Sequence, residues 1–161
     1  MRRREFCLMA LSLAALTGCG FHRRGVVELP FKRLFTTVDE DSKFGAQLRR
    51  LIRAASGVTF VDSPEAAEAT LEMPASRRSR HVISLNTKGE AREYELTQTM
   101  VFRITGKGGR EFMPATTFQS SRNMTYNDAE HISRGNEEAR LYDEMAEDIL
   151  TRLINTMGAL K

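Results

Sequence analysis

The chain has 161 residues, of which 24 are Lys or Arg and 21 are Asp or Glu, so its formal net charge is +3 at pH 7. This length is enough for one domain with a substantial core but hardly for two. The small charge excess and the presence of only two cysteines exclude a strongly basic protein and a disulfide framework.

The first 18 residues have the pattern of a secretory signal peptide. Arginines at positions 2–4 precede an apolar run over residues 6–16, which is too short to span a bilayer as a permanent helix. The sequence Leu16-Thr17-Gly18-Cys19 resembles the bacterial lipobox, in which the cysteine sulfur receives a diacylglyceryl group before cleavage. We therefore predict a signal peptide over residues 1–18 and lipidation of Cys19. The alternatives are ordinary secretory cleavage that leaves Cys19 as a spare thiol, and a hydrophobic terminus that merely resembles a signal.

The predicted mature chain is a single domain over residues 19–161, in which residues 19–34 form a lipidated tether. Loss of residues 1–18 removes three arginines and one glutamate, so the net charge falls from +3 to +1. Cys19 is then the only cysteine, which excludes a disulfide and a cysteine-based metal site. Secretion and a small charge exclude nucleic acid as a partner. Gly20, which follows the cysteine, resembles the sorting signal that sends lipoproteins to the outer membrane.

A strand near residues 33–38 and a helix are expected to open the domain. The side chains of residues 39–42, Asp-Glu-Asp-Ser, suit the start of this helix, and Gly57 suits its end. Apolar residues between them have helical spacing and predict one buried face: Phe44, Leu48, Leu51, Ile52 and Ala55. Short strands are then predicted over residues 58–61 and 69–73.

A hairpin is the clearest element of the middle of the chain. Alternating apolar residues over 81–85 and 94–104 predict two strands, each with one apolar face, and residues 86–89, Asn-Thr-Lys-Gly, have turn chemistry. A second turn at residues 106–109 leads to a strand over 112–118. The sheet is therefore expected to be mainly an antiparallel meander.

The end of the chain is expected to be a helix. A polar stretch over residues 120–128 is predicted to precede it, with Asn127 or Asp128 as its cap and Gly135 interrupting its first turns. The apolar stripe of this helix is typical of a protein core: Leu141, Met145, Ile149, Leu153, Ile154 and Met157. We predict an α+β fold in which two helices pack on one face of a mixed, mainly antiparallel sheet of four strands or slightly more, an α/β sandwich.

Residues typical of catalysis or metal binding are not arranged in any recognised pattern. His22, His81 and His131 are expected on a tether, a strand and a helix start, without the spacing of a zinc site. The glycines at 106–109 lack the spacing of a phosphate-binding loop. We therefore expect no enzyme activity, no metal and no cofactor.

Three segments in the same order resemble the lipopolysaccharide-assembly lipoprotein family, LptE. They are the start of the mature chain, the central hairpin and the opening of the last helix: Cys19-Gly20-Phe21-His22 with Arg24-Gly25; Ser84-Leu85-Asn86 with Gly89 and Glu93-Tyr94-Glu95-Leu96-Thr97; and Asn136-Glu137-Glu138. The resemblance covers the whole mature chain. It implies a mixed sheet backed by two helices, which agrees with the periodicities above.

This resemblance implies a lipoprotein of the outer membrane, anchored on the periplasmic side and inserted in a translocon β-barrel of the LptD type. It also implies lipopolysaccharide binding, and the basic contacts of the family fall near the Lys88 turn and near Arg134. Phosphates of lipopolysaccharide attract Lys and Arg, so the candidate contacts are Lys88, Arg92 and Arg134, and less surely Arg80 with Arg77 and Arg78 on a loop. Each of these could instead be an ordinary solubilising charge.

Two other functions remain open at this stage. One is a scaffold lipoprotein of another envelope complex. The other is a lipid-anchored periplasmic hydrolase or lipid-transfer module, which should show a nucleophile constellation or an apolar pocket.

Overall fold

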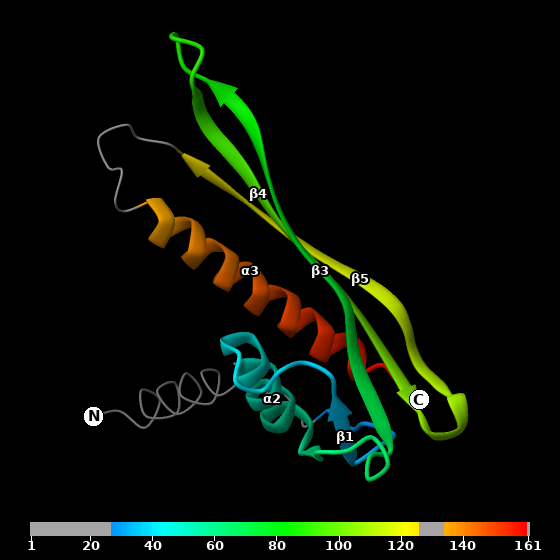
Figure 1. Ribbon diagram of the computed structural model, residues 1–161. Helices are drawn as coiled ribbons and strands as arrows, with labels where there is room; N and C mark the ends of the chain where they lie inside the picture. The colour runs from blue at the N-terminus through cyan, green and yellow to red at the C-terminus, as the bar shows by residue number, and fades with distance from the viewer. Residues whose placement is uncertain (1–26, 126–133, 161) are drawn as a thin grey trace, which may run out of the picture.

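The computed structural model describes residues 27–125 and 134–160 as a long twisted sheet with helices on one side (Figure 1). The predicted signal peptide, Cys19 and the predicted caps Asn127 and Asp128 lie outside these residues. In chain order the elements are β1 (Arg33–Thr36), α2 (Lys43–Ser56), β2 (Thr59–Phe60), β3 (Ala69–Leu85), β4 (Ala91–Gly106), the 3-10 turn η2 (Lys107–Gly109), β5 (Glu111–Thr125) and α3 (Arg134–Met157).

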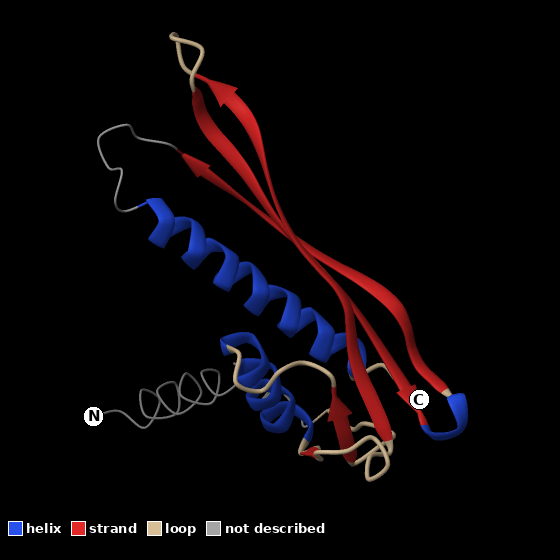
Figure 2. Ribbon diagram, in the orientation of Figure 1, coloured by secondary structure: helices blue, strands red, loops and turns tan. Residues whose placement is uncertain are grey.

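The sheet has five strands in the order β2-β1-β3-β4-β5. The short strands β1 and β2 are parallel to each other, and β1 is parallel to β3. The three long strands form an antiparallel meander, which extends far beyond the short ones (Figure 2). The predicted fold class, two helices on one face of a mixed and mainly antiparallel sheet, is confirmed.

The core lies between the sheet and the two helices. Phe102 of β4 is fully buried at its centre, with its ring 6.5 Å from Phe44 of α2 and 5.9 Å from Phe118 of β5. The second half of α3 joins this core, and its first half packs with Leu96 and Met124 in a smaller adjoining cluster. None of the helices in the described part of the chain is both long and apolar enough to cross a membrane.

The start of α2 is fixed by local hydrogen bonds. Ser42 Oγ accepts a bond of 3.0 Å from the Gly45 amide, which satisfies one of the free N–H groups of the first turn. A Cβ atom at Gly45 would lie 1.8 Å from the Asp39 carbonyl oxygen, so only glycine fits this close approach. The helix ends, as predicted, at Gly57, which has a φ of 67°.

Two predictions about the strands are wrong. Residues 69–73 and 81–85 belong to one strand, β3, and Arg77, Arg78 and Arg80 therefore lie on a strand and not on a loop. Residues 120–125 belong to β5 and not to a loop. Both stretches are too polar to show apolar alternation. They pair with β4 all the same, because backbone hydrogen bonds depend on no side-chain type.

Truncation of the central aromatic residue tests this account of the core. Phe102→Ala should lower the free energy of unfolding by about 3–5 kcal/mol, because it removes the ring that joins α2 to β5 and leaves a cavity. Val101→Ala, one position away on the open face of the sheet, should cost no more than about 1 kcal/mol. Urea unfolding of the two variants measures the difference, and equal losses would contradict the assignment of the buried face.

Candidate functional site

The distal half of the β3–β4 hairpin projects beyond the start of α3 (Figure 1). Its turn is closed by the Asn86 side chain, whose Oδ1 accepts bonds of 2.9 Å from the Lys88 amide and 3.0 Å from the Glu90 amide. Asn86 Nδ2 donates to the Glu90 carboxylate at 2.8 Å. Gly89 has a φ of 81°, a conformation that favours glycine. The turn that presents Lys88 is therefore well defined.

Three large apolar side chains are exposed just below this turn. The exposed fractions are 51% for Val82, 48% for Ile83 and 61% for Leu85. The pairing of β3 with β4 shifts register on both sides of Ser84, so the expected alternation of one apolar face breaks down here. These side chains make residues 82–85 an exposed apolar segment, interrupted only by Ser84.

Lys88 and Arg92 flank this apolar segment at the tip. Both residues are exposed. Arg92 lies between Ala91 and Glu93, whose partners on β3 are Leu85 and Ser84. The structure thus brings these two predicted site residues to the same end of the hairpin, next to exposed apolar side chains.

Arg80 lies farther down the same hairpin. Its Nη1 donates to Glu138 of α3 at 3.3 Å, and its guanidinium lies 5.0 Å from the centre of the Tyr94 ring. Arg80 pairs with Leu96, four positions from Arg92 on β4, which is about 13 Å along a strand. The predicted cations therefore occupy two places, the tip and the start of α3.

Arg134 is the first residue of α3, so its backbone lies one helical turn before Glu138, the partner of Arg80. The side chain of Arg134 lies outside the described residues. Arg80 and the backbone of Arg134 thus mark the same region, where α3 begins beneath the hairpin.

Two buried residues, Gln98 of β4 and Tyr142 of α3, hold Arg78 in place. Gln98 is fully buried, and its Oε1 accepts a bond of 3.0 Å from Arg78 Nε. The Arg78 guanidinium lies 4.7 Å from the centre of the Tyr142 ring. Tyr142 donates to the Ser79 carbonyl at 3.1 Å; burial, aided by the charge of Glu138, raises the pKa of its hydroxyl. In the sequence, the only sign of this arrangement is that the polar Gln98 interrupts the apolar face of β4.

In residues 27–125 and 134–160, no group of three His, Cys, Asp or Glu side chains is placed to hold a metal ion. Of the three histidines, His81 is exposed on β3, while His22 and His131 lie outside the described residues. The described site therefore offers cations and apolar side chains, which suit binding of an amphiphile.

Comparison with known proteins gives consistent matches along most of the chain. The family model described as LptE: Lipopolysaccharide-assembly matches residues 31–157. The chain is 28% identical over 109 residues to the LPS-assembly lipoprotein LptE of Pectobacterium atrosepticum, a match that covers 65% of this chain and 59% of that protein. It is 25% identical over 153 residues to the LPS-assembly lipoprotein LptE of Photorhabdus laumondii subsp. laumondii, covering 93% and 82% of the two chains.

Solved structures share the fold. The solution structure of uncharacterized lipoprotein B from Nitrosomonas europaea has a TM-score of 0.71 and 28% identity, covering 87% of this chain and 91% of that one. The crystal structure of rare lipoprotein B from Shewanella oneidensis has a TM-score of 0.67 over 79% of this chain and 94% of that one. At 20% identity the second likeness supports the fold alone.

Proposed function

The chain belongs to the LptE family of lipopolysaccharide-assembly lipoproteins, and we propose that it binds lipopolysaccharide and plugs a translocon β-barrel of the LptD type. In this proposal the protein has no enzymatic activity. It is held at the periplasmic side of the outer membrane by lipid on Cys19 and helps lipopolysaccharide reach the outer leaflet.

The observation that carries lipopolysaccharide binding is the amphipathic tip of the hairpin. Lipid A joins phosphates to acyl chains, and the tip places the cations Lys88 and Arg92 next to the exposed Val82, Ile83 and Leu85. Charge-assisted hydrogen bonds suit the phosphates, and the apolar side chains suit the acyl groups. Arg80 and Arg134 belong to the second basic region of the proposed site, at the start of α3.

The side chains on the open face of the sheet support the proposal that the partner is a β-barrel. The wall of a large membrane barrel presents polar side chains to its lumen. On the face that the helices leave open, the long strands carry hydroxyl and amide side chains, such as Thr99 beside Gln119, and Thr117. Hydroxyl and amide groups of this kind can donate and accept hydrogen bonds to such a wall.

Charge reversal at the tip tests lipopolysaccharide binding. Lys88→Asp with Arg92→Asp should weaken binding at least about tenfold, because each lost charge-assisted contact is worth about 1.5–3 kcal/mol. The matched control, Arg50→Asp with Arg152→Asp, makes the same charge change at exposed positions on the two helices and should bind normally. Binding is measured at fixed moderate salt, with melting temperatures for all variants. Equal binding by both folded double variants would remove Lys88 and Arg92 from the site.

Replacement of Cys19 tests the anchor. Cys19→Ala should abolish incorporation of labelled palmitate and leave the precursor uncleaved, because the lipobox cysteine is the proposed acceptor. The fold should survive, since the core lies within the residues that follow position 27. Labelling of Cys19→Ala at the level of the parent protein would rule out this anchor.

Photo-cross-linking in intact cells tests the barrel partner. A photo-reactive amino acid at Thr87, on the turn, or at Ser121, on the open face, should capture an outer-membrane β-barrel protein after irradiation. Detergent extracts should yield the two proteins in equal amounts. Failure of both positions at normal protein levels would contradict the plug and favour the scaffold alternative.

A further inference from the structure

One edge of the sheet is unpaired along most of β3. The strand β1 pairs with β3 only from Ala69 to Leu71, and within the described residues no strand lies on that side farther along. From Pro74 to Ile83 every residue of β3 except Ser79 is exposed, whereas its neighbour β4 is mostly buried or half-buried. Proline within a sheet is confined mainly to edge strands, which fits the position of Pro74.

The hydrogen-bond pattern shows which backbone groups of β3 face this edge. The Lys107 amide donates to the Glu68 carbonyl, so the odd-numbered residues of β4, which has no bulge in this stretch, direct their backbone groups to β3. Arg77 and Ser79 pair with two of these residues, Thr99 and Thr97, so their own backbone groups face β4. The backbone groups of Ser76, Arg78 and Arg80 therefore face the open edge.

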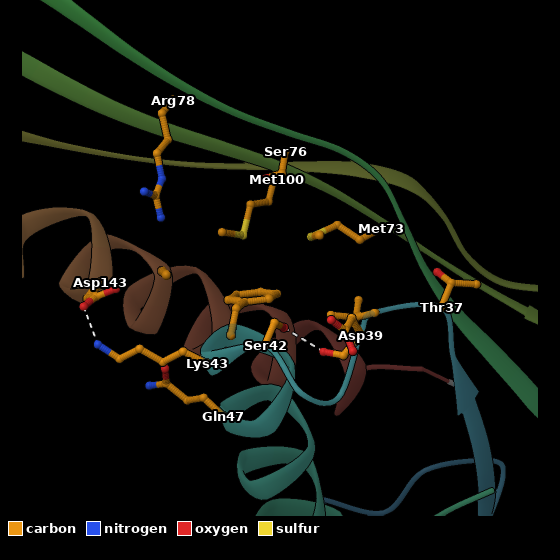
Figure 3. Close-up of a pocket in the computed structure, with 13 residues that line it drawn as sticks. Thr37, Asp39, Ser42, Lys43, Gln47, Met73, Ser76, Arg78, Met100 and Asp143 are labelled. Atoms are coloured by element: carbon orange, nitrogen blue, oxygen red, sulfur yellow. Dashed lines mark hydrogen bonds and ion pairs between the residues drawn. The ribbon is translucent and has the colours of Figure 1, made fainter. Parts of the chain in front are cut away.

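Two cavities lie beneath this edge and adjoin at Arg78. The first, of about 370 Å³, lies between the sheet, the start of α2 and α3, and its apolar wall includes Phe44, Met73 and Met100 (Figure 3). The second, of about 440 Å³, is lined by Arg78 and Arg80 on β3 and by Glu138 and Tyr142 on α3. Together they follow β3 from Met73 to Arg80, about 23 Å along a strand.

The edge strand is basic. The chain has no Asp or Glu between Glu72 and Glu90, while Arg77, Arg78 and Arg80 lie in this interval. Among the residues that the structure describes, the terminal nitrogens of Arg78 have no hydrogen-bond acceptor, although Gln98 and Tyr142 fix its position. A guanidinium held in this way presents a planar fork that suits a carboxylate.

We propose that this edge of β3 binds an extended acidic segment of a partner protein as an added strand. Main-chain hydrogen bonds to the edge would supply affinity, and the cavities would accept alternate side chains. An apolar side chain would enter the cavity beside Phe44, and a carboxylate would pair with Arg78. Charges on an edge strand also prevent aggregation, but that role requires no cavities beneath the edge. The surface is separate from the hairpin tip and does not depend on lipopolysaccharide binding.

A model peptide gives a direct test with the mature protein in detergent micelles. The probe is an eight-residue peptide of alternating Glu and Val with blocked ends, and the readout is amide hydrogen exchange followed by NMR. The peptide should slow exchange at the edge-facing amides of β3 between Ala75 and His81 and leave the turn at 86–89 unchanged. The same peptide with every amide N-methylated has no N–H to donate to the edge and should give no protection, and alternating Lys and Val should bind more weakly.

A charge variant completes the test. Arg78→Glu should weaken binding of the acidic peptide about tenfold, the value of one charge-assisted contact, while Arg50→Glu on α2 should leave it unchanged. No protection of β3 by the acidic peptide would overturn the proposal. Equal effects from the N-methylated peptide or from inorganic phosphate would also overturn it, because they would show anion binding without an added strand.

Discussion

Packing of α3 against β4 and β5 is the contact on which the rest of the structure depends. The apolar stripe of α3 reaches both clusters of the core, because Met145 packs with Leu96 and Met124, while Ile149 and Leu153 pack with the main core. One helix therefore holds the middle and the lower part of the long strands together. The energy of this contact comes from burial of large apolar side chains, because the part of the chain that the structure describes contains no cysteine to form a disulfide.

The same contact leaves part of the sheet uncovered. Because α3 lies beneath β4 and β5, most of β3 between Pro74 and Ile83 is exposed, and the hairpin continues past the start of the helix. An unsupported hairpin would be marginal in water, yet here it extends from strands that are anchored in a core. The exposed apolar side chains at the tip and the unpaired backbone of β3 both result from the position of α3 beneath β4 and β5.

Some charged side chains are held by other residues of the protein, and others are exposed at the hairpin tip. At the junction of the two helices, Lys43 pairs with Asp143 at 2.5 Å and Gln47 donates to Glu147 at 2.6 Å. These exposed contacts add little to stability but fix how α2 meets α3. Lys88 and Arg92 at the tip lie beyond the reach of the helix acids, so they suit an external anion. Lys43 therefore helps to hold the two helices together, whereas Lys88 and Arg92 are the cations proposed to bind lipopolysaccharide.

The helices, the central turn and the fold class were predictable from the sequence, because these depend on short-range patterns. Helical spacing identified the buried face of α2, and the Asn86 turn identified the hairpin. The length of β3, the strand position of Arg78 and the two cavities beneath it follow from long-range packing, which no local pattern shows. A strand that pairs along one edge and faces solvent needs no alternation of apolar and polar residues. The two-residue repeat that predicts a strand is therefore missing from its sequence. Where α3 packs determines which part of that strand stays open.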